Sequence, residues 1–307
     1  MEHRSEASVK GRLTIFLKGM AMGIADSVPG VSGGTIAVMA GIYEELIHSL
    51  KNLNPLQLPT HCKGGVRQFW QNINGGFLLA LLLGVVTSLY LSANTVLYLL
   101  EFQYPLVMAF FAGLVFASTW FLRKQISCWQ RREIGFLLLG AGITLLISLG
   151  NPLAGNYSYF YVFFCGLIAI CAMILPGISG AFILILLGVY DHVLSALRAL
   201  EFGVIIVFVS GCVIGLLSFA HLLSWTFFYY RQQTYAFLTG MLAASVVVLW
   251  PWKLVSDGEL MEVTYLSPGR FESMTGQSSQ LLSVILLVLL GYSVVAIFER
   301  ITSSRLS

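Results

Sequence analysis

Two copies of an uncommon motif interrupt apolar stretches of this chain and limit what it can fold into. The first copy is Pro29–Gly33 (PGVSG), and the second, 147 positions later, is Pro176–Gly180 (PGISG). Each is followed at the same distance by a Gly-x-Tyr-acid tetrapeptide, at Gly41–Glu44 and at Gly188–Asp191. A Pro-Gly pair breaks a helix and leaves backbone groups unpaired, which a bilayer tolerates only where the backbone faces protein or a wet cavity. Such breaks at matching positions of two halves are typical of the binding site of a membrane transporter.

Composition indicates a membrane protein. The chain of 307 residues is 57% hydrophobic and 10% charged, whereas soluble domains have roughly 25% charged residues. Its net charge of +3 is too small and too dispersed to indicate nucleic-acid binding. Six apolar runs of at least 17 residues are each long enough to cross a bilayer, and they lie at about 76–100, 104–122, 134–150, 203–230, 234–252 and 280–298. The sequence therefore predicts an all-α polytopic membrane protein.

The motifs divide the chain into two repeats, 1–150 and 151–307. Each repeat begins with a broken segment, 13–50 or 158–198, in which two helical pieces flank the Pro-Gly turn. The second piece is long enough for either a re-entrant arm or a tilted full span. Either hairpin returns the chain to its starting side, and three spans follow it. This odd number of crossings turns the second repeat upside down relative to the first.

A second alignment, shifted by 127 positions, extends the repeat beyond the hairpins. It pairs Gly76, Gly84, Phe110, Gly113 and Ser118 with Gly203, Gly211, Phe237, Gly240 and Ser245.

The basic residues predict the orientation. With a cytoplasmic N-terminus, fourteen Lys and Arg side chains fall in inside segments, and only Arg198, Lys253 and Arg270 fall outside. Cytoplasmic loops of membrane proteins carry this excess of positive charge. Both termini are therefore expected in the cytoplasm.

The hairpins suggest a site for an anion. After each turn a helix begins, and its first N–H groups and macrodipole favour negative charge. Ser32 and Ser179 are candidate hydroxyl ligands, and the glycines beside them, Gly33 and Gly180, let a ligand approach the backbone. Alternatively, the serines only cap their own helices. Arg198 could gather phosphate near the outer end of the second hairpin.

Four titratable residues are candidates for ion coupling or gating. Asp26 precedes the first turn, and its counterpart is Met173; an intramembrane acid could carry H+, bind Na+ or cap exposed N–H groups. Glu44 and Asp191 occupy matched positions that are expected near water, which favours a structural or gating role. His221 lies within the 203–230 span, where it could relay protons or bond a neighbouring helix.

The sequence contains no catalytic or phosphate-loop signature, and its five cysteines are scattered without a zinc or disulfide pattern. We therefore expect no enzyme activity, no metal and no cofactor other than a coupling ion.

The segment Gly23–Thr35 (GIADSVPGVSGGT), together with the partner motif around Pro176, resembles the PopT-type polyprenyl-phosphate transporter family of bacterial membranes. The resemblance covers nearly the whole chain. It implies movement of undecaprenyl phosphate, the carrier lipid of cell-wall synthesis, from the outer to the inner leaflet of the cytoplasmic membrane. The matching positions are Asp26, Ser32, Gly33, Gly34, Thr35, Ser179 and Gly180.

This substrate suits the physical chemistry, because a charged phosphate crosses hydrocarbon only at great cost while a prenyl tail remains in lipid. Two other functions fit the residues: ion-coupled transport of a small soluble anion, and an intramembrane enzyme acting on a lipid phosphate.

Overall fold

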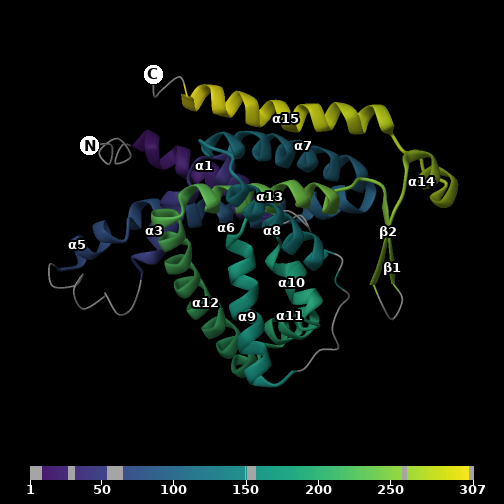
Figure 1. The fold of residues 1–307 in the computed structure, drawn as a ribbon. Helices are drawn as coiled ribbons and strands as arrows, with labels where there is room; N and C mark the ends of the chain where they lie inside the picture. The colour runs from purple at the N-terminus through teal and green to yellow at the C-terminus, as the bar shows by residue number, and fades with distance from the viewer. Residues whose placement is uncertain are drawn as a thin grey trace.

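The structure is a computed structural model that describes residues 9–26, 32–53, 65–148, 150, 157–257 and 261–303. The predicted turn residues Pro29 and Gly30 lie outside these ranges. The described residues form helices and one two-stranded antiparallel sheet (Figure 1). The elements are α1 (Val9–Asp26), α2 (Gly33–Met39), α3 (Tyr43–Lys51), α5 (Gly65–Asn72), α6 (Gly75–Phe102), α7 (Tyr104–Leu122), η2 (Arg123–Gln125), α8 (Arg131–Ser148), α9 (Tyr159–Ile174), α10 (Gly180–Leu186), α11 (Tyr190–Ala199), α12 (Phe202–Tyr229), α13 (Arg231–Val248), β1 (Lys253–Asp257), β2 (Met261–Tyr265), α14 (Pro268–Thr275) and α15 (Leu281–Ser303).

The six predicted apolar runs fall on α6, α7, α8, α12, α13 and α15. Among the described residues, two helical stretches, Tyr104–Gln125 and Phe202–Tyr229, are long and apolar enough to cross a membrane by themselves. The pair α10 and α11, bent by 107°, is a third candidate for a broken span or a re-entrant loop. The chain is an all-α membrane protein in its main architecture.

Each broken segment contains a second break that the sequence analysis did not predict. The stretch 32–50 is not one helix, because α2 ends at Met39 and α3 begins at Tyr43. Gly41 between them has a φ of +68°, and Gly188 at the matched position between α10 and α11 has a φ of +66°. Residues with a side chain rarely adopt this left-handed conformation. The glycine of each Gly-x-Tyr-acid tetrapeptide therefore ends one short helix and redirects the chain into the next.

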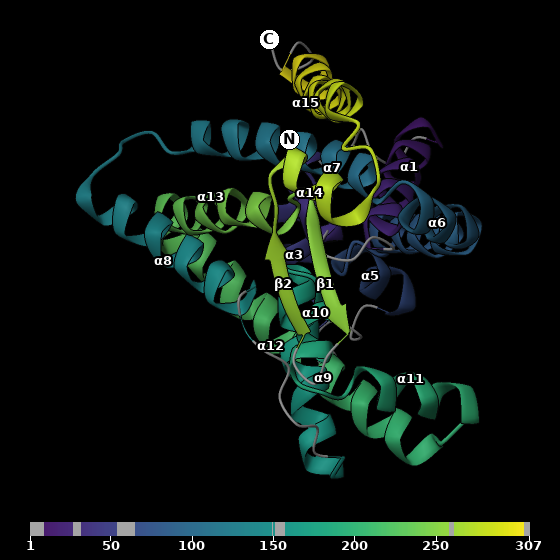
Figure 2. The same ribbon diagram turned by 90° about the vertical axis from the view of Figure 1, so that its right-hand side faces the viewer.

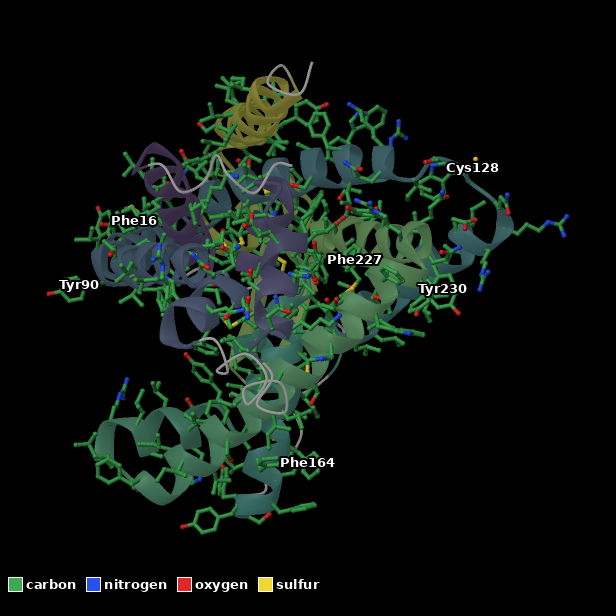
Figure 3. The ribbon with its side chains drawn as sticks, turned by 90° about the vertical axis from the view of Figure 1, so that its left-hand side faces the viewer. Phe16, Tyr90, Cys128, Phe164, Phe227 and Tyr230 are labelled. Carbon is green, nitrogen blue, oxygen red and sulfur yellow. The ribbon has the colours of Figure 1, made fainter. Side chains whose placement is uncertain are left out.

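Large apolar side chains cover much of the outer surface. Tyr90 on α6 is 84% exposed and Phe228 on α12 is 80% exposed. In Figure 3, Tyr90 and Phe164 point away from the helices that carry them, whereas Phe227 lies between segments. Extended apolar surface of this kind is unusual for a soluble monomer and suits contact with lipid.

The helices pack in matched pairs. In the first half α1 packs on α6, and in the second half α9 packs on α12. The remaining spans pair across the halves, because α7 packs on α15 and α8 packs on α13. The α7 and α13 helices also contact each other. The two halves therefore interlock and do not form separate bodies.

The same backbone contacts occur in both halves. A Cβ atom on Gly84 of α6 would collide with the carbonyl oxygen of Phe16, and one on Gly211 of α12 would collide with that of Phe163. Phe16 corresponds to Phe163 under the shift of 147 positions, and Gly84 corresponds to Gly211 under the shift of 127 positions, so the two contacts are equivalent. Small residues let helices approach closely in membranes, where dispersion contacts between helices supply much of the association energy.

In the helix pairs that join the two halves, aligned glycines also lie against backbone carbonyls. Gly113 of α7 lies against the carbonyl of Val288, and Gly240 of α13 lies against that of Leu137. Four glycines of the second alignment, Gly84, Gly113, Gly211 and Gly240, thus lie at close helix contacts, whereas a Cβ on Gly76 would meet nothing within 4 Å.

Figure 1 shows the overall arrangement. Helices α1, α7, α13 and α15 run across the upper part of the molecule, and α9 and α12 descend from it. The strands β1 and β2 and helix α14 lie at one end of the upper helices (Figures 1 and 2). At the opposite end lie α3, α5 and the start of α1.

Candidate functional site

The two broken segments meet at the start of α2. The backbone N–H of Gly177 donates to Thr35 Oγ1 at 3.0 Å, and Thr35 is 1% exposed. The Ser32 hydroxyl lies 3.3 Å from the carbonyl oxygen of Met173 and 3.2 Å from that of Leu175. These contacts place the start of α2 against the Pro-Gly turn of the second half. We call this contact region the junction.

The backbones approach closely at the junction. A Cβ atom on Gly34 would lie 2.5 Å from the carbonyl oxygen of Ile174 and 3.2 Å from that of Met173. Gly177 has a φ of +91°, and a Cβ there would lie 3.0 Å from the carbonyl oxygen of Met241. Both positions thus require glycine, Gly34 in α2 for close approach and Gly177 in the turn for its backbone conformation.

Protein groups occupy the first N–H groups of α2. The Asp26 carboxylate accepts a hydrogen bond from Gly33 N at 2.6 Å, and Ser32 Oγ accepts one from Gly34 N at 3.1 Å. The N–H of Thr35 donates to the carbonyl of Ser32 at 2.9 Å. Ser32 therefore caps its own helix. Asp26 holds the position at the helix N-terminus that an anion would occupy.

The start of α10 differs from that of α2. Ser179 is the N-cap residue of α10, but its side chain makes no capping hydrogen bond, and Met173 replaces the acid. Ser179 and Phe182 line a small cavity together with Gly177 and Ile178 of the turn. A Cβ atom on Gly180 would lie 2.8 Å from the carbonyl oxygen of Ala169. A short helix, α2 or α10, thus begins in each half just after the motif, but the polar groups at the two helix starts differ.

The other predicted residues lie outside the junction. Glu44, in the first turn of α3, pairs with Arg231 at 2.9 Å and also accepts a hydrogen bond from the Tyr235 hydroxyl. Asp191 and Arg198 lie in the exposed first and last turns of α11. His221 is half-buried on α12, with Nδ1 3.3 Å from the carbonyl oxygen of Leu217. No cluster of three metal-binding side chains occurs within the described ranges.

The sequence analysis missed two side chains that donate hydrogen bonds to corresponding carbonyls of the two halves. Lys18 Nζ donates to the carbonyl of Ala40 at the end of α2, at 2.8 Å. In the second half, the Tyr161 hydroxyl donates to the carbonyl of Leu187, at 2.9 Å. The two carbonyls are equivalent under the 147-position shift, and each would otherwise lack a helical partner. The donors come from different positions, so the alignment alone did not reveal them.

Replacing Thr35 by Val should destabilise the junction. Valine has the same shape but offers no acceptor, so the buried N–H of Gly177 would lose its partner at a cost of about 1–3 kcal/mol. Thr144→Val is the matched control, because Thr144 Oγ1 is equally buried and has no hydrogen-bond partner. Thermal unfolding in detergent should show a lower midpoint for Thr35→Val and an unchanged or higher one for Thr144→Val. Equal midpoints for Thr35→Val and the parent would contradict the role of this bond.

Comparison with known proteins places the sequence among membrane transporters of a lipid phosphate. The model of the undecaprenyl phosphate translocase-like family matches residues 22–264. A protein of Vibrio cholerae serotype O1 named polyprenyl-phosphate transporter is 41% identical over 296 residues, covering 94% of this chain and 96% of that protein. A Staphylococcus aureus protein of the same name is 29% identical over 253 residues, covering 76% of this chain and 85% of that protein. No solved structure matches. The chain belongs to the undecaprenyl phosphate translocase-like family.

Proposed function

We propose that this protein moves undecaprenyl phosphate across the bacterial cytoplasmic membrane, returning the carrier lipid for further rounds of cell-envelope synthesis. The observation that carries the proposal is the junction, where two broken apolar segments meet through Thr35 and Gly177. Broken helices that meet in this way are the usual substrate sites of transporters. The names of the two relatives support the substrate class.

A lipid substrate needs a polar path for its head group only. The prenyl tail remains in hydrocarbon, and the exposed apolar surface of α6 and α12 leaves room for it beside the protein. The head group carries a charge that the bilayer core penalises heavily. Backbone N–H groups at the broken segments would replace the lost hydration, with Gly33, Gly34, Gly180 and the serines beside them nearest the phosphate.

Asp26 gives this path a means of ion coupling. Its carboxylate accepts the Gly33 N–H, which an incoming phosphate would also use. A carboxylate and a phosphate repel each other, so the ionised acid excludes the substrate from this position. Protonation weakens the bond to Gly33 and removes the repulsion. We propose that Asp26 takes up H+ when the head group enters and releases it when the head group leaves.

The proposed topology is an inverted repeat of residues 1–150 and 151–307, with both termini in the cytoplasm. The excess of basic residues supports this orientation. Figure 1 also shows the start of α1 and the end of α15 on the same side of the molecule.

Reconstitution into liposomes tests the function. We expect the protein to move labelled undecaprenyl phosphate between leaflets without altering it chemically. Uptake of a soluble anion in place of the lipid would favour the second candidate function, and release of inorganic phosphate would favour an enzyme. Undecaprenyl pyrophosphate provides the head-group control.

A further inference from the structure

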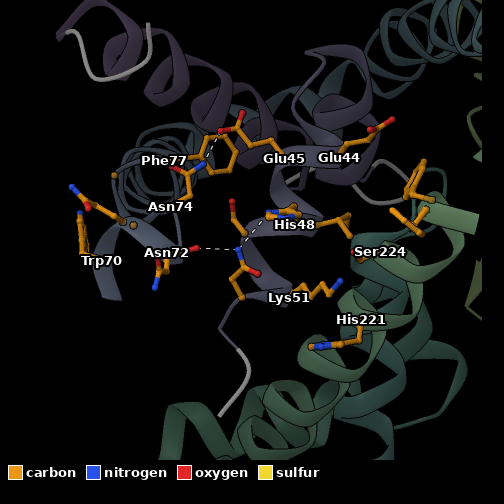
Figure 4. A pocket seen from close by; sticks show the side chains of 18 of the residues that line it. Glu44, Glu45, His48, Lys51, Trp70, Asn72, Asn74, Phe77, His221 and Ser224 are labelled. Atoms are coloured by element: carbon orange, nitrogen blue, oxygen red, sulfur yellow. Dashed lines mark hydrogen bonds between the residues drawn. The ribbon is translucent and has the colours of Figure 1, made fainter. Parts of the chain in front are cut away.

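A large cavity lies between α3, α12 and the start of α6, apart from the junction. Its volume is about 1670 Å³, and α5 and the start of α1 also contribute to its lining. Figure 4 shows Lys51 extending into the cavity from α3 and His221 from α12. These elements lie at the end of the molecule that we propose to face the cytoplasm.

Among the described residues that line the cavity, positive side chains outnumber negative ones. Protein donors engage both carboxylates of the lining: Glu44 bonds Arg231 and Tyr235, and Glu45 accepts from the Asn74 side-chain amide at 2.7 Å. Glu44 therefore neutralises Arg231, and Asn74 holds Glu45 toward the start of α6 (Figure 4).

Three further cations line the same cavity: Arg12, Lys51 and Arg67. Within the described ranges none of the three takes part in an ion pair. They come from three separate elements, α1, α3 and α5. The cavity thus concentrates positive charge, which raises the local concentration of an anionic ligand.

The rim of the cavity is aromatic. Trp225 and Phe228 of α12 are 49% and 80% exposed, and Trp70 of α5 is 44% exposed. Trp225 and Phe228 belong to the apolar outer surface of α12, which is suited to lipid, and Trp70 lies across the cavity on α5 (Figure 4). A small soluble anion would make no apolar contact with these aromatic side chains. An amphiphile would place its charged group inside the cavity and its apolar chain across the aromatic side chains.

We propose that this cavity is a second head-group site, which holds a lipid-linked phosphate monoester on the cytoplasmic side through Arg12, Lys51 and Arg67. A phosphate monoester carries between one and two negative charges near neutral pH, which suits a cavity lined by three cations that are outside ion pairs. The proposal rests on the proposed function and extends it. The head group passes the junction and is then retained in the basic cavity until the lipid leaves past the aromatic rim.

Binding of undecaprenyl phosphate to the full chain in nanodiscs tests the proposal. The double variant Lys51→Gln/Arg67→Gln should weaken binding at least tenfold, since each change removes a charge-assisted contact with phosphate. The variant Lys51→Arg/Arg67→Lys keeps the charge and should stay within about threefold of the parent. The matched control is Arg123→Gln/Arg131→Gln, which removes two cations from η2 and α8 outside the cavity lining and should bind like the parent.

Each result has a distinct meaning. Parent-like binding by Lys51→Gln/Arg67→Gln would overturn the second site while leaving the proposed function intact. Equal loss in the Arg123→Gln/Arg131→Gln control would also overturn it, since charge anywhere on this side would then suffice. Inorganic phosphate that competes at the same concentration as the lipid would overturn the lipid ligand. Failure of the parent to bind or move the lipid would overturn both proposals.

Discussion

Asp26→Asn should slow lipid transport at least tenfold and remove its dependence on pH. Asparagine can still accept the N–H of Gly33, so α2 should keep its start, but the amide cannot gain or lose a proton in the working pH range. In the parent, falling pH protonates Asp26, which removes its repulsion of phosphate and weakens its bond to Gly33 N–H, so transport should rise as the pH falls. Leaflet relocation of labelled lipid in liposomes, measured across a pH series, gives both quantities.

Glu44→Gln is the matched control for this experiment. The Glu44 carboxylate pairs with Arg231, and both side chains are exposed, Arg231 to 63% and Glu44 to 44%. An exposed ion pair of this kind contributes about 0–1 kcal/mol to stability. Transport by Glu44→Gln should therefore stay within about threefold of the parent. If Glu44→Gln is slower than Asp26→Asn at equal protein amounts, Asp26 is not the coupling group. The same conclusion follows if Asp26→Asn keeps the pH profile of the parent.

Gly140→Ala should destabilise the protein strongly for a single added methyl group. Its Cβ would collide with the carbonyl oxygen of Phe237, so α8 would have to move away from α13. Overpacking of this kind costs about 1–3 kcal/mol. Gly142→Ala is the control two residues further along α8, because a Cβ there meets nothing within 4 Å. It should leave stability unchanged or raise it by about 0.5–1 kcal/mol, since alanine favours a helix.

The other helix pair that joins the two halves, α7 and α15, allows a second measurement. Gly291 of α15 lies against the carbonyl of Phe110, as Gly140 lies against that of Phe237. Gly291→Ala should therefore lower the thermal midpoint in detergent by about as much as Gly140→Ala. A midpoint at or above that of the parent for either variant would show that the helices can separate freely, contrary to the close packing observed.

Local sequence was sufficient to predict the long apolar helices and the interruptions at the two Pro-Gly motifs. Apolar runs of sufficient length predicted the long helices, because a bilayer requires a minimum number of apolar residues per span. The Pro-Gly pairs predicted where helices are interrupted, although the additional break at Gly41 was missed. That break depends on the positive φ of Gly41. A glycine can adopt a positive φ but is not forced to, so its presence in the sequence does not by itself predict a break. The motif also singled out Ser32 and Thr35, which lie at the junction.

Only the tertiary structure decided which helices pair and which polar groups meet. The pairing of α8 with α13 and of α15 with α7 depends on matching surfaces that are far apart in the sequence, which no local periodicity encodes. The bond from Gly33 N–H to Asp26 likewise depends on how the chain folds back on α1, so the sequence could not show that an acid already holds this helix start. The basic cavity arises in the same way. Its cations come from three separate elements and share one space only when α1, α3 and α5 are in place.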